Sequence, residues 1–257
     1  MPESATPTID RADAHTEMPS LKGRRVLVSG GTTGIGRAIA VLLASEGARL
    51  FICGRAPEPL ADALARIREV GEGEGINVDL ATQEGVDRFV DEAERFLGGI
   101  DIAVINAGLA AEGLETSPVE TIRYVVDTNL TAMMTTARRV VERMQPGGDI
   151  VFIGSMSAVS RSPESTVYTA TKTGVQAVAE ALGKELAEKD IKVGNIEPGL
   201  VGTDMQSPDT PPPEQREMIH AGKMLRAEDI AVAAQFMLTQ PRRTLVSLMR
   251  VMPRLSE

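Results

Sequence analysis

The residues of this sequence best suited to chemistry are Tyr168 and Lys172, which are four positions apart. On a helix this spacing places two side chains on the same face. A free phenol has a pKa of about 10 and is a poor acid–base group at neutral pH, but a nearby ammonium favours the phenolate and lowers that pKa. The pair predicts a general acid/base that moves a proton to or from an alcohol oxygen. Taken alone, the motif is more typical of an exposed pair.

Two further polar residues could complete this site. Ser155 lies thirteen residues before Tyr168 at the end of an apolar segment, where its hydroxyl could polarise a substrate carbonyl. Ser157 is the main competitor for that role. Asn129 falls inside a segment with helical spacing, where an amide is mildly unfavourable. We expect Asn129 either to belong to the site or to be a hydrogen-bonded core residue.

A glycine-rich turn after the first apolar segment predicts a phosphate site. Glycines let the backbone approach a pyrophosphate, and the N-terminus of the following helix supplies N–H donors and a positive dipole end. The spacing is Gly-x-x-x-Gly-x-Gly, and a purely structural turn is the alternative. The candidate residues are Gly30, Thr32, Thr33, Gly34, Ile35 and Gly36.

The second apolar segment ends at Cys53-Gly54-Arg55, where a dinucleotide-binding fold reads the adenosine ribose. An Asp or Glu there would bind the 2′-hydroxyl. Here Gly54 takes that place and Arg55 follows, whose guanidinium can pair with a phosphate. We expect NADP(H) to be preferred, with NAD(H) as the alternative. Cys53 is interpreted as a small buried residue rather than a reactive thiol.

Polar and small residues also follow the third and fourth apolar segments. Asp79 and Leu80 could contact an adenine, the alternative for Asp79 being a turn or helix N-cap. Asn106, Ala107 and Gly108 leave room for a cofactor, and the Asn106 amide could equally tie neighbouring strands together.

Short apolar segments alternate with segments of helical spacing along most of the chain. This pattern predicts βαβ units and an α/β fold with a doubly wound parallel sheet. The apolar segments, typical of strands buried on both faces, are 25–28, 50–53, 75–78, 100–105, 150–153, 191–196 and 244–249. The predicted helices are 35–46, 57–70, 83–97, 118–144, 166–188 and 227–239.

Two regions depart from this alternation. Residues 1–20 are polar and aperiodic, which predicts a flexible tail or, alternatively, an arm that packs on a partner subunit. Residues 199–226 include three consecutive prolines, which cannot continue a helix or a strand. Long irregular insertions are often lids, so we expect one catalytic domain over 21–257 with a substrate lid at about 199–226. The lid's apolar residues either contact a partly apolar substrate or pack the lid onto the body.

Composition excludes several classes of protein. The formal net charge of -9 over 257 residues argues against nucleic acid and anionic membranes as partners. No apolar run reaches the roughly 20 residues of a membrane span. One cysteine excludes an intrachain disulfide, and two histidines exclude a His-rich metal site, so no metal is expected. These features together predict a cytoplasmic location.

In their order along the chain, these motifs resemble the short-chain dehydrogenase/reductase family in its single-domain branch, over about residues 21–251. The resemblance adds Pro198-Gly199 followed by Thr203. It implies a Rossmann-fold three-layer sandwich with a central parallel sheet of about seven strands and helices on both faces. It also implies NAD(P)-dependent hydride transfer between an alcohol and a ketone or aldehyde, most simply as an NADPH-dependent reductase.

The resemblance further implies a role for each site residue. Tyr168 is the proton donor or acceptor, and Lys172 lowers its pKa and binds the nicotinamide ribose. Ser155, rather than Ser157, holds the substrate oxygen, and Asn129 orders a water in a proton relay. The contacts on the nicotinamide side are implied for Pro198, Gly199, Val201 and Thr203.

Three residues depart from the family pattern. Ser29 replaces a threonine, Ile105 replaces the first asparagine before Ala107-Gly108, and Thr33 stands where many NADP-dependent members carry a basic residue. The alternatives to an oxidoreductase are a non-catalytic dinucleotide-binding regulator or redox sensor, and a relative of sugar-nucleotide epimerases or dehydratases. The resemblance implies a small-molecule carbonyl or alcohol substrate. The family also pairs its two long helices between subunits, so we expect a homodimer or homotetramer.

Overall fold

The computed structural model describes residues 18–163, 165–203, 205 and 210–255. Within these residues, seven strands form one parallel sheet in the order β3-β2-β1-β4-β5-β6-β7. The predicted parallel sheet is therefore confirmed. The strands are β1 (Arg25–Ser29), β2 (Arg49–Gly54), β3 (Glu72–Asn77), β4 (Ile102–Ile105), β5 (Asp149–Ile153), β6 (Lys192–Pro198) and β7 (Leu248–Val251).

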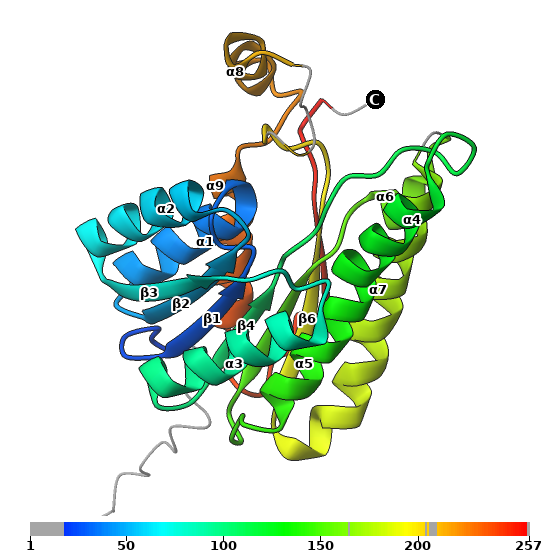
Figure 1. Cartoon of the computed structure of the whole chain (residues 1–257). Helices are drawn as coiled ribbons and strands as arrows, with labels where there is room; N and C mark the ends of the chain where they lie inside the picture. The colour runs from blue at the N-terminus through cyan, green and yellow to red at the C-terminus, as the bar shows by residue number, and fades with distance from the viewer. Residues whose placement is uncertain (1–17, 164, 204, 206–209, 256–257) are drawn as a thin grey trace, which may run out of the picture.

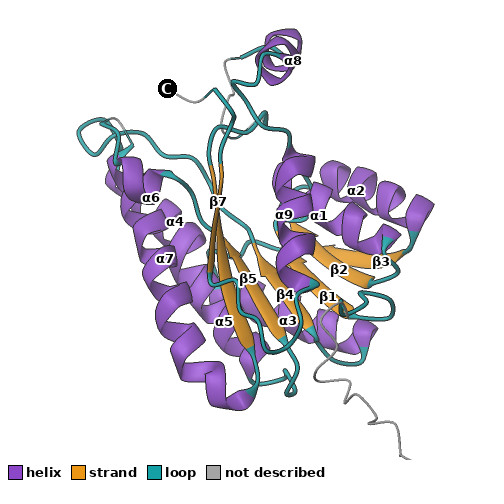
Figure 2. Ribbon diagram, turned by 180° about the vertical axis from the view of Figure 1, so that it is seen from behind, coloured by secondary structure: helices purple, strands orange, loops and turns teal. Residues whose placement is uncertain are grey.

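Helices cover both faces of the sheet, which gives the three predicted layers (Figures 1 and 2). One face is covered by α1 (Gly34–Ser45), α2 (Pro57–Val70) and α9 (Ala227–Leu238). The opposite face is covered by α3 (Gln83–Leu97), α5 (Ala132–Val141) and α7 (Thr166–Leu186). The remaining helices are α4 (Val119–Val126), α6 (Ser157–Ser160) and α8 (Pro212–His220).

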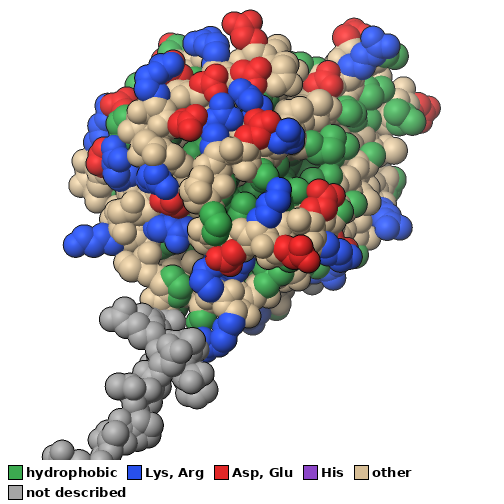
Figure 3. Space-filling view, turned by 90° about the horizontal axis from the view of Figure 1, so that it is seen from below, with side chains coloured by type: hydrophobic (Ala, Val, Ile, Leu, Met, Phe, Trp, Pro, Cys, Tyr) green, Lys and Arg blue, Asp and Glu red, His purple; other side chains and the backbone are tan. Residues whose placement is uncertain are grey.

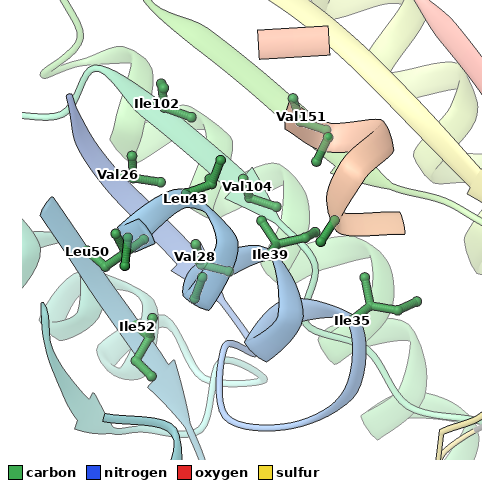
Figure 4. Packing of buried hydrophobic residues seen from close by; sticks show 14 of the residues in the cluster. Val26, Val28, Ile35, Ile39, Leu43, Leu50, Ile52, Ile102, Val104 and Val151 are labelled. Carbon is green, nitrogen blue, oxygen red and sulfur yellow. The ribbon is translucent and has the colours of Figure 1, made fainter. Parts of the chain in front are cut away.

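The hydrophobic core lies on both sides of the sheet because successive side chains of a strand point to opposite faces. Val26 and Val28 of β1 belong to the cluster beneath α1, together with Ile39 and Leu43 of that helix. Leu27, between the two valines, belongs to the opposite cluster. Figure 4 shows α1 laid over the first of these clusters, with Ile39 and Leu43 directed at the strands. This packing fixes the start of α1 above the carboxyl end of β1.

The strand order reverses between β1 and β4, because the chain runs outward to β2 and β3 on one side and to β5, β6 and β7 on the other. In open α/β sheets, ligands bind at such a switch point, beyond the carboxyl ends of the strands. The predicted site residues all follow strand ends or lie on helices that begin near this edge. The fold therefore brings them to one place.

The long helix predicted over 118–144 consists of three successive pieces. A π-helical turn, Asp127–Thr131, separates α4 from α5, and α5 ends at Val141. Such π turns are rare and frequently mark functional sites. This one contains Asn129, so the extra residue in the helix changes the direction in which the Asn129 amide points.

Two other predictions need correction. The last strand is Leu248–Val251 rather than 244–249, because Thr244 closes a turn by donating its N–H to the Pro241 carbonyl. The segment 199–226 is not irregular throughout, since α8 begins within the proline run. Proline suits the first turn of a helix, where the N–H groups have no helical partner. Figures 1 and 2 show α8 standing apart from the three layers, beyond the carboxyl ends of the strands.

Candidate functional site

A pocket opens at the switch point, and most of the predicted residues line it. Those that do are Gly30, Thr32, Thr33, Gly34, Ile35, Arg55, Asp79, Leu80, Asn106, Ala107, Gly108, Tyr168, Lys172, Pro198 and Thr203. Gly36, Asn129, Ser155, Gly199 and Val201 are not among its lining residues. The predicted phosphate site and the predicted acid–base pair thus share one pocket.

Asn106 and Ser29 fix the shape of the glycine turn. The Asn106 Nδ2 donates to the carbonyl oxygens of Ser29 and Gly30 at 3.1 and 3.0 Å. In return, Ser29 Oγ accepts the backbone N–H groups of Asn106 and Ala107 at 2.9 and 3.1 Å. Asn106 therefore ties β1 to β4, and the serine at position 29 still supplies the hydroxyl that this contact needs.

The N-terminus of α1 lies at this pocket, which Gly34 and Ile35 line. Its N-cap residue, Thr33, makes no side-chain hydrogen bond to the first turn of the helix, whose N–H groups have no partner within the helix itself. Gly36 lies behind the turn, where an added Cβ would come 2.2 Å from the Gly30 carbonyl oxygen. Gly36 therefore acts by letting helix and turn approach each other rather than by lining the pocket.

Tyr168 and Lys172 both reach the pocket from the first turns of α7. Lys172 is only 2% exposed, and its Nζ donates to the Ile153 carbonyl oxygen at 2.9 Å. The same Nζ lies 5.7 Å from the centre of the Tyr168 ring. Burial lowers the pKa of Lys172 from 10.5 to about 8, because removal from water disfavours the ammonium.

The predicted lowering of the tyrosine pKa is not found in the structure. Burial raises the pKa of Tyr168, and a hydrogen bond with Ser155 offsets this only in part. The sequence-based argument considered the lysine charge alone, whereas removal of the phenolate from water is the largest influence on this pKa. Tyr168 is therefore held in its protonated form at neutral pH.

Ser155 is the serine that contacts the phenol. It is 3% exposed, immediately follows the end of β5 and shares a hydrogen bond with Tyr168. Its Oγ also accepts the Ser157 backbone N–H at 3.1 Å. Ser157 begins the short helix α6 and thereby orients Ser155 through its backbone. Of the two candidate serines, Ser155 is therefore the one whose hydroxyl contacts Tyr168.

Asn129 is fully buried in the π turn and joins α4 and α5 to the loop after β4. Its Oδ1 accepts the Leu109 N–H at 2.7 Å, and its Nδ2 donates to the Leu109 carbonyl oxygen at 2.8 Å. A Cβ added to Gly108 would lie 3.5 Å from this Oδ1 and 3.6 Å from Lys172 Nζ. The amide and the lysine therefore flank the same glycine at the edge of the pocket.

Several lining residues escaped the sequence analysis. They are Val78, Thr128, Ile153 and Gly154, none of which belongs to a recognisable motif. Thr128 is 6% exposed, and its hydroxyl has no hydrogen-bond partner among the described residues. Cys53 also lines the pocket, but burial raises its pKa to about 12, so the thiol is inert as predicted.

A second tyrosine, Tyr124 of α4, was missed altogether. Its hydroxyl donates to Asp79 Oδ2 at 2.9 Å and accepts from Arg55 Nη1 at 3.1 Å. It thereby connects two residues that were predicted separately to contact the adenosine end of a cofactor. The chain has two tyrosines, and the scarcity of this residue type is the one signal that could have drawn attention to it.

The predicted lid is partly packed onto the body. Val201 is fully buried and pairs with Leu225 in an isolated parallel bridge. Met224 is 3% exposed and lies against Gly202. Val201 and Met224 thus hold the two ends of the segment together, whereas Thr203 and Met205 line the pocket. Asp204 and residues 206–209 lie outside the described residues.

The buried lysine predicts a pH-dependent stability. Between about pH 8 and 10.5 the unfolded chain binds more protons at Lys172 than the native chain does, so the cost of burying this group falls as pH rises. Lys172→Met removes this cost and is therefore expected to raise the free energy of unfolding above that of wild type. The increase should be roughly 2 kcal/mol larger near pH 7 than near pH 10. Denaturant titrations at the two pH values measure this difference. Lys184→Met, an exposed site on the same helix, is the control, and equal behaviour of the two variants would contradict the argument.

Among the described residues, no helix is both long and apolar enough to cross a membrane. No group of three or more His, Cys, Asp or Glu side chains among the same residues is arranged to hold a metal ion.

Known proteins resemble this chain over most of its length. The family model for short chain dehydrogenases matches residues 24–214. An uncharacterized oxidoreductase of Staphylococcus aureus (strain USA300) is 31% identical over 239 residues, which cover 92% of this chain and 100% of the relative. A second, from Staphylococcus saprophyticus, is 33% identical over 241 residues with the same coverage.

Solved structures give the same result. A dehydrogenase/reductase from Sinorhizobium meliloti 1021 superposes with a TM-score of 0.82 at 29% identity, covering 90% of this chain and 95% of that one. A short chain dehydrogenase from Burkholderia cenocepacia J2315, in complex with NADP, has a TM-score of 0.82 at 26% identity, covering 91% and 98%. The chain thus belongs to the short-chain dehydrogenase family, as its motifs predicted. It is accordingly a dehydrogenase/reductase enzyme of a family that binds NAD(P).

Proposed function

We propose that this enzyme is an NADPH-dependent reductase that converts a ketone or an aldehyde to an alcohol. The observation that carries the proposal is the gathering of Ser155, Tyr168 and Lys172 beside a pocket whose other side is the glycine turn. Hydride transfer from a dinucleotide to a carbonyl needs a site that holds the phosphates of the cofactor and an acid–base group of the protein beside the substrate. This pocket offers both.

The residues of the pocket suit a dinucleotide. The uncapped N-terminus of α1 and the backbone of Gly30 to Ile35 would hold the pyrophosphate. Lys172, Pro198 and Thr203 would hold the nicotinamide end. When bound there, a reduced nicotinamide supplies the hydride.

The chain's own residues would supply the proton and orient the substrate. Ser155 Oγ accepts the Ser157 N–H, and its hydroxyl, which is hydrogen-bonded to Tyr168 here, would turn its proton to the substrate carbonyl oxygen. Tyr168 would give its phenolic proton to the same oxygen as an alcohol forms. Its raised pKa keeps that proton in place at neutral pH, which suits reduction.

Lys172 and Asn129 would support this proton transfer. Lys172, with a pKa of about 8, can carry or release a proton near neutral pH. One lone pair of the Asn129 amide oxygen accepts the Leu109 N–H, so ordering a water would use the other.

The adenosine end favours a 2′-phosphate. A Cβ at Gly54 would come 2.4 Å from Thr32 Cγ2, so an Asp or Glu that could bind a 2′-hydroxyl does not fit there. Arg55 lines the pocket beside this glycine and carries the positive charge that a 2′-phosphate needs. We therefore keep NADP(H) as the preferred cofactor and NAD(H) as the alternative.

The substrate would lie between the catalytic residues and the segment 199–226, which we propose acts as a lid. Leu109 and Met205 give this part of the pocket an apolar lining, which fits a partly apolar carbonyl compound. The proposal is tested by following NADPH oxidation with a panel of ketones and aldehydes. Tight NADPH binding with no turnover on any of them would instead favour the regulator or redox sensor.

We also propose that the enzyme is a homodimer or homotetramer. Among the apolar residues of α5 and α7, Met133 and Val175 are buried within the chain, whereas Met134 is 40% exposed and Val178 is half-buried. Figure 3 shows hydrophobic side chains gathering on the side of the molecule where α5 and α7 lie in Figure 1. Size-exclusion chromatography with light scattering is expected to give a dimer or tetramer, and a monomer at micromolar concentration would refute this.

A further inference from the structure

The hydroxyl of Tyr124 lies between a cation and an anion at the adenosine end of the pocket. Arg55 Nη1 donates to it at 3.1 Å, and it donates in turn to Asp79 Oδ2 at 2.9 Å. Arg55 follows β2, Asp79 follows β3 and Tyr124 belongs to α4, so three separate elements meet at this hydroxyl. Arg55 and Asp79 line the pocket.

Arg55 is oriented by this contact without being neutralised. Among the described residues, no carboxylate lies within ion-pair distance of its guanidinium, and its side-chain partner is a neutral phenol. By contrast, Arg25 and Arg49, which begin β1 and β2, form ion pairs with Asp101 and Glu72. Arg55 thus keeps its full charge at the edge of a pocket in a protein whose net charge is -9.

Asp79 would otherwise be the natural partner of this guanidinium. Its Oδ1 accepts the Ala81 N–H at 3.0 Å and its Oδ2 accepts the Tyr124 hydroxyl, so each carboxylate oxygen already accepts one hydrogen bond. The phenol oxygen thus bridges the two charged groups, and the hydrogen bonds on either side of it strengthen each other by polarisation.

We infer that Tyr124 determines the preference of this enzyme for a 2′-phosphorylated dinucleotide. It is a positioning residue: its hydroxyl holds Arg55 at the pocket edge and keeps it from forming an ion pair with Asp79. The guanidinium then remains available for a fork of hydrogen bonds to a phosphate. The inference rests on the NADP(H) preference proposed above and names the residue that maintains it.

Removing the hydroxyl alone tests this role. Tyr124→Phe keeps the aromatic ring on α4 and removes only the hydroxyl. Asp79 Oδ2 then loses its donor and becomes the strongest acceptor near Arg55. The resulting ion pair would compete with the 2′-phosphate. NADPH is expected to bind about tenfold more weakly, which is the loss of one charge-assisted contact, while NADH affinity changes little.

The measurement is a titration of NADPH and NADH, followed by the emission of the bound cofactor, for wild type and Tyr124→Phe. Asp79→Asn and the double variant Asp79→Asn/Tyr124→Phe are added, because an amide carries no charge to capture Arg55. The double variant should recover most of the NADPH preference that Tyr124→Phe loses. A loss caused only by disturbed packing would not be recovered in this way.

A further variant separates this inference from the cofactor proposal. If Arg55→Ala removes the NADPH preference while Tyr124→Phe leaves it intact, Arg55 acts without help and the inference is wrong. If neither variant changes the ratio of the two affinities, the NADP(H) proposal itself fails and the inference fails with it. Loss of the preference in both, with recovery in the double variant, supports both statements.

Discussion

Replacing Tyr168 by phenylalanine is expected to lower turnover by about a thousandfold, because general acid catalysis by a positioned side chain contributes roughly 10²–10⁴ to the rate. The variant keeps the ring that packs in this buried position and removes only the group that would protonate the substrate oxygen. Steady-state NADPH oxidation with the best carbonyl substrate measures the loss. NADPH affinity should stay within a few fold of wild type, since the phosphate site lies elsewhere in the pocket.

A control and a pH profile sharpen this test. Ser157→Ala should retain most activity, because Ser157 orients Ser155 through its backbone N–H rather than its hydroxyl. Reduction by the wild type should hold across neutral pH and fall as pH rises through the raised Tyr168 pKa, above about 10, where the proton donor is lost. Turnover in Tyr168→Phe close to that of wild type would show that another group supplies the proton.

The parts of the site that the sequence revealed are those encoded in short, local spacings. The glycine turn, the Asn106 triplet and the Tyr168–Lys172 pair each sit at a strand end or on one helix face, and the alternation of strands and helices brings them together at the switch point. The placement of Ser155 is of the same kind, since it follows β5 and shares a hydrogen bond with Tyr168 near the start of α7.

What the sequence did not reveal depends on contacts between distant segments. Tyr124 is important through Arg55 and Asp79, which are 69 and 45 residues away. The π turn at Asn129 contains no glycine or proline, so nothing in its sequence marks it as a break in the helix. The pKa of Tyr168 could not be inferred from its lysine neighbour, because the largest influence on it is burial, which is a property of the whole fold.

Arg55→Ala is the second change with a large expected effect. The Arg55 guanidinium is the group that would bind a 2′-phosphate. Loss of its charged, bidentate hydrogen bonds should weaken NADPH binding by about 10- to 100-fold. NADH has a neutral hydroxyl at that position, so its affinity should change little. Titrating both cofactors with wild type and variant gives the ratio directly.

The control for this result is another arginine on the neighbouring helix. Arg123 is exposed on α4, next to Tyr124, and does not line the pocket. If general attraction between a cationic surface and an anionic ligand were responsible, Arg123→Ala would weaken NADPH binding about as much, and added salt would abolish both effects. A specific contact predicts that the Arg55 effect is much the larger and persists at physiological ionic strength. Equal or tighter binding of NADH by the wild type would overturn the cofactor preference and turn the search toward alcohol substrates and oxidation.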